Sequence, residues 1–200
     1  GRTIYFDTNT ATPEIINCTF VNNAQYGLRN DMSYTPVVKN CIVYGNISGG
    51  AYGNLDITYS LIEGGFSGTG NIDSDPQFVK VITTGDEESD YHLKDWSPAI
   101  GAGTATGAPT TDLEGNPRPN PAGSNPDMGA FENKWGTPQN APPVIATQSD
   151  LTIAEDGTST ATLTATDAND DAITYSAVSD TNAVTVSVSS STLTLTPNAN

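Results

Sequence analysis

The chain has few basic residues, two cysteines and no long apolar run, and each scarcity excludes a class of protein. Seven lysines and arginines stand against 23 aspartates and glutamates among 200 residues, which gives a net charge of −16. Such a surface repels a nucleic-acid backbone, so we expect no DNA or RNA partner. No apolar run approaches the roughly 18–20 residues that span a bilayer, so we expect no membrane span in this chain. Two cysteines do not make the disulfide framework of a small secreted domain.

The single histidine, His92, restricts the catalytic constellations that the chain can hold. Asp90 or Asp95 could orient its ring as a general base. However, neither a Ser-His-Asp arrangement nor a G-x-S-x-G elbow can be assembled from the sequence. We therefore assign no catalytic residue in this chain.

The acidic residues are unevenly distributed. Residues 1–72 hold five acids and three bases, whereas residues 73–200 hold eighteen acids and four bases. Together with abundant Thr, Ser, Asn and Gly, this acidity is typical of extracellular proteins, which meet calcium. The chain begins with Gly1 and shows no signal segment, so we expect it to be a piece of a longer protein.

A short motif repeats in the first third of the chain. The segment "INCTFVNN" (16–23) resembles "KNCIVYGN" (39–46), and "TYSLIEGG" (58–65) continues the series. The offsets are 23 and 19 residues, and small or apolar residues alternate within each unit. This period of two predicts short strands with one buried face. A strand, a turn and a return after about twenty residues describe one coil of a parallel β-helix.

Stacking of successive coils at about 4.8 Å would bring equivalent residues together. Asn23 and Asn46 would become stacked turn residues whose side-chain amides bond along the column. Cys18 and Cys41 would become neighbours inside the stack, at a separation that suits a disulfide. They would equally fill space as free buried thiols, an alternative that we favour.

Several motifs in order resemble one group of secreted bacterial proteins, namely right-handed parallel β-helix proteins that end in a choice-of-anchor Q domain. The motifs are "NCIVYGN", "IDSDPQFV" (72–79), "DYHLKDWSPAIGAG" (90–103), "TDLEGNPRP" (111–119) and "PDMGAFE" (126–132). The resemblance implies an all-β fold with the C-terminal coils and cap of a right-handed parallel β-helix. It also implies a secreted or cell-surface location. The group includes polysaccharide-degrading enzymes and surface proteins, so it leaves the activity open.

Residues 111–132 place four acids around one arginine in a segment rich in proline and glycine. A glycosidase-like carboxylate pair needs a cleft between two acids, and a turn-rich segment does not by itself supply one. We expect Arg118 to pair with Asp112 or Asp127 and to lock the loop. The segment is thus predicted to be a cap that covers an open end of the stack, where unpaired strands would invite aggregation.

A proline-containing linker separates this region from a C-terminal part with a different composition. Residues 144–200 contain five short alternating segments between turns, including "AITYSAVSD" (172–180), which is typical of a β-sandwich. This part resembles bacterial cadherin-like and immunoglobulin-like modules, but it is short for one, so we expect a truncated sandwich. The predicted organisation is coils over 1–78, a terminal segment over 79–135, a linker over 136–143 and the partial sandwich over 144–200.

The best candidate for a metal site is "DANDD", 167–171. Asp167, Asn169 and Asp171 alternate oxygen ligands as at the start of a calcium loop, although the EF-hand pattern fails after them. The cadherin-like resemblance implies that Glu155 or Asp156 completes such a site, with Ca²⁺ as the cofactor. The alternative is an Asx turn between two strands.

Tyrosines in the repeats suggest contact with sugar rings. We predict Tyr26, Tyr44 and Tyr52 as carbohydrate-binding residues, with ordinary packing as the alternative. Two functions are consistent with these observations. One is an extracellular protein that binds a polysaccharide, a cell-surface glycan or another partner in an adhesive or structural role. The other is the C-terminal part of a polysaccharide lyase or glycoside hydrolase whose catalytic coils lie upstream.

Overall fold

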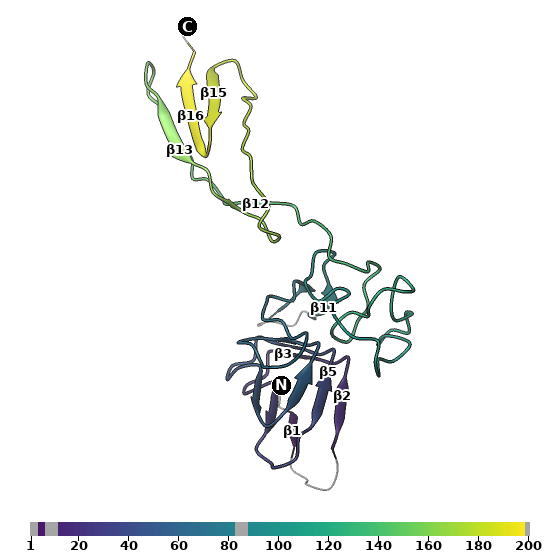
Figure 1. The fold of residues 1–200 in the computed structure, drawn as a ribbon. Helices are drawn as coiled ribbons and strands as arrows, with labels where there is room; N and C mark the ends of the chain where they lie inside the picture. Colours follow the sequence, from purple (N-terminus) through teal and green to yellow (C-terminus); the bar gives the residue numbers. More distant parts are fainter. Residues whose placement is uncertain (1–3, 7–11, 83–87, 199–200) are drawn as a thin grey trace. The chain divides into compact units, whose positions relative to one another are not determined.

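The computed structural model describes residues 4–6, 12–82 and 88–198, and over these ranges the protein is all-β without any helix (Figure 1). The described residues accordingly include no helix that is long and apolar enough to cross a membrane. The chain divides into two compact units, residues 1–140 and 141–200.

The first unit contains three parallel sheets, each built of three strands from successive turns of the chain (Figure 1). One sheet consists of β1 (Ile4–Phe6), β4 (Leu28–Asn30) and β7 (Ala51–Gly53). The second consists of β2 (Glu14–Ile16), β5 (Val37–Lys39) and β8 (Asp56–Thr58). The third consists of β3 (Thr19–Val21), β6 (Ile42–Tyr44) and β9 (Leu61–Ile62). We refer to these nine strands and their turns as the strand stack.

The register of the third sheet is the one that the sequence repeat predicts. Thr19 of β3 lies opposite Ile42 of β6, which lies opposite Leu61 of β9. These pairs reproduce the offsets of 23 and 19 residues, so the predicted alignment of the three units is confirmed.

Left-handed backbone conformations explain why the chain bends at the same place in each turn. Asn17, Asn40 and Tyr59 each precede a strand of the third sheet and have φ of 51°, 52° and 49°. Asparagine tolerates this region better than most residues, whereas tyrosine rarely enters it. The next corner also repeats, with positive φ at Asn22, Gly45 and Gly64.

The third sheet is buried on both faces because two apolar clusters pack against it. Val43 and Ile62 point into the first cluster inside the strand stack, together with Leu28, Val38, Cys41 and Ile57. Ile42 and Leu61 point outward into the second cluster, together with Phe78, Leu93, Ile100 and Met128. The alternation of these side chains therefore requires a cover on the outer face, as for any sheet that is apolar on both sides.

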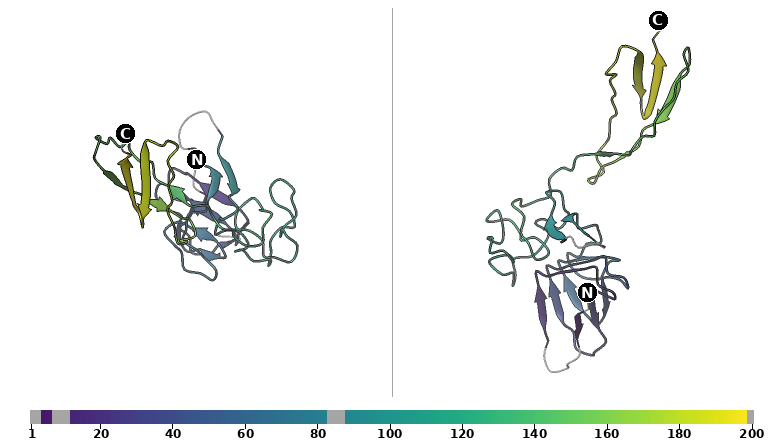
Figure 2. Two further views of the ribbon diagram at one scale, coloured as in Figure 1. Left: turned by 90° about the horizontal axis from the view of Figure 1, so that it is seen from above. Right: turned by 180° about the vertical axis from the view of Figure 1, so that it is seen from behind.

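Residues 78–82 and 88–140 supply this cover, mostly as irregular chain (Figure 2). Their only regular element among the described residues is an antiparallel pair, β10 (Phe78–Lys80) and β11 (Asp90–Leu93). The backbone N–H of Met128 donates to Ala99 at 3.0 Å, and that of Gly129 donates to Asn40 of the strand stack at 2.7 Å. The cover thus lies along the outer face of the third sheet, whereas the sequence suggested a cap over the open end.

The second unit contains two small antiparallel sheets. One pairs β12 (Val144–Ile145) with β14 (Ala165–Thr166), and the other has the order β13 (Ser159–Thr162), β16 (Thr192–Pro197), β15 (Val184–Ser189). Residues 172–180 lie outside both sheets, so the strand predicted there is wrong. Alternation alone does not make a strand, because a strand also needs a hydrogen-bonded neighbour.

Candidate functional site

The outer surface of the first sheet carries a column of two tyrosines and an arginine. Tyr5 of β1, Arg29 of β4 and Tyr52 of β7 lie opposite one another in the parallel register. The residues on either side of Arg29, Leu28 and Asn30, are buried, which places the column on the outward face of the sheet.

The arginine lies between the two tyrosine rings and is held there by an acid. Its guanidinium carbon is 5.9 Å from the ring centroid of Tyr5 and 5.6 Å from that of Tyr52. Its Nε donates to Asp31 at 2.9 Å, and the hydroxyl of Tyr5 donates to the same carboxylate oxygen at 3.1 Å. These contacts fix the orientation of the guanidinium without burying it.

A third tyrosine extends the surface. The rings of Tyr26 and Tyr52 have centroids 5.1 Å apart and planes tilted by 31°. Tyr5 is 50 % exposed and Tyr52 is 48 % exposed, which is unusual for large aromatic side chains. We call this set the tyrosine–arginine face: Tyr5, Tyr26, Arg29, Asp31 and Tyr52.

Two of the three tyrosines predicted to bind carbohydrate, Tyr26 and Tyr52, belong to this face. Tyr44 lies instead on β6 in another sheet, beside a cavity of about 320 Å³. Burial raises the pKa of Tyr44, and the nearby acids, led by Asp75, raise it further. Tyr5 was missed from the sequence because the visible repeat begins only after it. Arg29 was missed because only strand pairing places it between Tyr5 and Tyr52.

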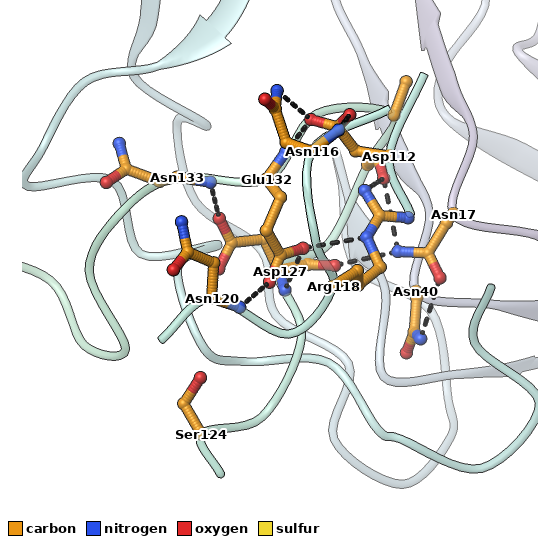
Figure 3. A network of polar contacts seen from close by, with 12 residues as sticks. Asn17, Asn40, Asp112, Asn116, Arg118, Asn120, Ser124, Asp127, Glu132 and Asn133 are labelled. Carbon is orange, nitrogen blue, oxygen red and sulfur yellow. Dashed lines mark hydrogen bonds and ion pairs between the residues drawn. The ribbon is translucent and has the colours of Figure 1, made fainter. Parts of the chain in front are cut away.

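A buried polar network lies where the cover meets the strand stack (Figure 3). At its centre, Arg118 Nε donates to Glu132 Oε2 at 2.8 Å, and the two side chains are only 1 % and 0 % exposed. The prediction that Arg118 pairs with Asp112 or Asp127 is therefore wrong. The Glu132 carboxylate accepts three hydrogen bonds, from the Arg118 side chain and from the backbone N–H groups of Asn120 and Asp127.

The two acids that were predicted to pair with Arg118 accept hydrogen bonds from backbone N–H groups and, at Asp112, also from the Asn116 side chain (Figure 3). Asp112 accepts hydrogen bonds from Asn116, Glu114 and the N–H of Glu132. Burial alone would raise the pKa of Asp112, but these bonds outweigh it and the pKa is lowered. Asp127 accepts from the N–H groups of Gly101 and Asn133.

Asp127 differs from Asp112 because it is fully buried. Burial raises its pKa to about 7, although its two backbone hydrogen bonds act in the opposite direction. Its own backbone carbonyl accepts from Asn17 Nδ2 at 2.9 Å, and Asn17 Oδ1 accepts from Asn40 Nδ2 at 3.2 Å. The network therefore joins the cover to two turns of the strand stack, and its geometry is that of a structural lock.

The remaining predicted structural residues form two short ladders in the strand stack. Asn23 Nδ2 donates to Asn46 Oδ1 at 2.7 Å, so these turn residues lie one above the other. Cys18 and Cys41 each directly precede one of the paired strands β3 and β6, and both are free thiols. Cys41 is fully buried, whereas Cys18 is partly exposed.

His92 lies on β11 between two carboxylates. Its Nδ1 is 2.6 Å from Asp90 and its Nε2 is 3.3 Å from Glu114, and the ring stacks on Phe131 with centroids 4.1 Å apart. Burial alone would lower the pKa of His92, but the bonds to Asp90 and Glu114 raise it. Asp90 is thus the partner that orients His92, which is one of the two alternatives that the sequence left open. His92 links β11 to two other parts of the cover, Glu114 and Phe131.

The predicted calcium residues lie in the second unit. Asp167 Oδ1 accepts from the N–H groups of Asn169 at 2.8 Å and Asp171 at 3.2 Å, which is an Asx turn. Asn169 Oδ1 accepts from the N–H of Ala141. Asp156 has a φ of 66° in a tight turn that also contains Glu155. Among the described residues, no three acidic, histidine or cysteine side chains gather into a metal-binding group, and calcium stays a prediction.

Comparison of the chain with models of protein families, with curated proteins and with solved structures finds no match. Its function has therefore to be inferred from the geometry of its own residues.

Proposed function

We propose that this chain is part of a secreted or cell-surface protein that binds an uncharged polysaccharide or cell-surface glycan through the tyrosine–arginine face. The strand stack would be the C-terminal coils of a right-handed parallel β-helix, of the type that ends in a choice-of-anchor Q segment. The second unit would be a truncated cadherin-like or immunoglobulin-like β-sandwich that acts as a spacer.

The observation that carries this proposal is the exposed column Tyr5–Arg29–Tyr52. An aromatic ring has a negative face, which attracts the polarised C–H bonds of a sugar ring lying flat upon it. Tyr5 and Tyr52 are two strand spacings apart, which is about 9.6 Å and comparable with the length of a disaccharide. A polysaccharide would therefore lie across the strands, along the column of Tyr5, Arg29 and Tyr52.

Polar groups between the tyrosines suit the hydroxyl groups of such a ligand. The Arg29 guanidinium is a donor and the Asp31 carboxylate is an acceptor, and they are already paired at 2.9 Å. Because this pair is neutral as a unit and the chain carries a net charge of −16, an anionic polymer would be repelled. The charge balance therefore favours a neutral glycan.

The test is a binding comparison of neutral and anionic polysaccharides with the 200-residue chain, by affinity electrophoresis and calorimetry. Tyr52→Ala is expected to weaken binding of a neutral polymer at least about tenfold, because a central aromatic contact contributes about 1.4 kcal/mol or more. Trp135→Ala is the matched control, since Trp135 is also an exposed aromatic residue but lies in the cover.

Equal binding by Tyr52→Ala and the wild type would contradict the proposal, as would a preference for anionic polymers. Shortening of the polymer during the experiment would favour the alternative function, a lyase or hydrolase.

A further inference from the structure

A column of small polar side chains runs through the interior of the strand stack. Cys18, Cys41 and Ser60 occupy equivalent positions just before the strands of the third sheet. Each donates a hydrogen bond to the carbonyl two residues earlier, at 3.3, 3.2 and 3.0 Å. The three side chains are therefore held in the same orientation in successive turns.

The first two members of this column are close enough to be joined. The N–H of Ile42 donates to the carbonyl of Cys18 at 2.9 Å, so Cys18 and Cys41 lie on directly paired segments. Parallel neighbours are about 4.8 Å apart, which is within the Cα separation of about 4.4–6.8 Å that a disulfide accepts. The two thiols also influence each other's titration, since Cys41 lowers the pKa of Cys18. A bond between the sulfur atoms therefore requires little movement of the backbone.

The two thiols differ in their access to solvent. Cys41 is completely buried. Cys18 lines a cavity of about 450 Å³ between β3 and the cover, whose other walls include Phe20, Thr111, Leu113, Arg118 and Ala130. Of the two thiols, Cys18 is therefore the one next to a cavity that a small polar oxidant could enter, whereas Cys41 is buried.

The charged and titratable groups around Cys18 favour its thiolate. The neighbouring Cys41 thiol lowers the pKa of Cys18 to about 7 against the opposing effect of burial, and the positive charge of Arg118 also lowers it. The acid at the cavity wall, Asp112, accepts hydrogen bonds from several backbone and amide donors. Burial raises the pKa of Cys41 well above its ordinary value, so the proton of the pair stays on Cys41.

We propose that Cys18 is a modification site for hydroperoxides and that Cys41 resolves the product as a disulfide. The Cys18 thiolate attacks one oxygen of the peroxide, the O–O bond breaks, and Cys18 becomes a sulfenic acid while hydroxide leaves. The Cys41 sulfur then attacks the sulfenic sulfur, the S–O bond breaks, and the Cys41 proton leaves with the hydroxyl group as water. Each disulfide consumes one peroxide, and a dithiol reductant restores the two thiols.

Hydrogen peroxide tests this pair directly in the 200-residue chain. We expect the folded wild-type protein to lose two hydrogen atoms in its intact mass and to yield a peptide that links Cys18 to Cys41. Treatment with dithiothreitol should reverse both changes. Alkylation by iodoacetamide before oxidation should label Cys18 at least tenfold faster than Cys41, and the rate should rise with pH around 7.

Two variants separate the roles. Serine is a suitable replacement at either position, because Ser60 already occupies the equivalent site in the next turn. Cys41→Ser should accumulate the sulfenic acid, which dimedone traps at Cys18, and Cys18→Ser should leave Cys41 unoxidised. Faster alkylation of Cys41, oxidation of Cys41 in Cys18→Ser, or over-oxidation of the wild type without a disulfide would each overturn the proposal.

Discussion

Replacing Glu132 with glutamine tests whether a buried charge pair holds the cover together. The change keeps the shape of the side chain but removes the charge that balances Arg118, and both side chains are at most 1 % exposed. It also places an NH₂ group among three donors, since both carboxylate oxygens of Glu132 accept hydrogen bonds. An uncompensated buried charge of this kind costs about 3–5 kcal/mol of unfolding free energy.

The measurement is thermal and urea unfolding of the wild type and Glu132→Gln. A loss of about 3–5 kcal/mol corresponds to a melting temperature lower by roughly 6–20 °C for a unit of this size. Lys134→Gln is the control, because Lys134 and Asp95 form an exposed pair at 3.5 Å. Such a pair contributes about 0–1 kcal/mol, so its loss should shift the melting temperature by only a few degrees.

A further variant distinguishes the charge from the hydrogen bonds. Arg118→Met combined with Glu132→Gln removes both charges, so it should be more stable than Glu132→Gln alone, although the donor of Asn120 still meets an imperfect partner. A stabilising role of the Arg118–Glu132 pair is refuted if Glu132→Gln melts within about 2 °C of the wild type, which is less than 1 kcal/mol. It is also refuted if the double variant is the least stable of the three.

Two further outcomes are expected. Asp90 and Glu114 raise the pKa of His92 in the folded protein. The contacts of protonated His92 with these acids therefore stabilise the fold fully below the unfolded pKa, and this stabilisation is lost as the pH rises through the folded pKa. The melting temperature of the wild type should fall from pH 6 to pH 8, and it should fall less in His92→Gln. An identical pH dependence in the two proteins would contradict this role of His92. EDTA is expected to lower the melting temperature of residues 141–200, because it would remove calcium from the predicted site at Asp167. An unchanged melting temperature would contradict the calcium site and would support the alternative, a structural Asx turn.

Local features of the repeat were predictable from the sequence alone. The offsets between the units follow from the repeated motif. The proximity of Asn23 to Asn46 follows in the same way, because parallel pairing in register brings equivalent residues together. The bend at Asn17 and Asn40 was not predicted, because the alternation predicts one continuous strand from Ile16 to Phe20.

The partners of long polar side chains were not predictable. Four acids lie within fourteen residues of Arg118 on one side or the other, and turn chemistry does not rank them. Glu132 is the partner because the chain folds back so that Glu132 and Arg118 are both shielded from water. Likewise, Tyr5 joins Arg29 and Tyr52 only through strand pairing over an offset of 24 residues, in a part of the chain where no repeated motif is visible.

The sequence by itself therefore determined the all-β class, the register of the third sheet and the ladders inside the strand stack. These features depend on which residues share a face of a strand, and side chains that alternate with a period of two show which residues those are. Only the tertiary structure decided what covers each face. Ile42 and Leu61 needed an apolar cover, and Phe78, Leu93, Ile100 and Met128 pack against them. Burial depends on chain far away in the sequence, so no local pattern specifies it.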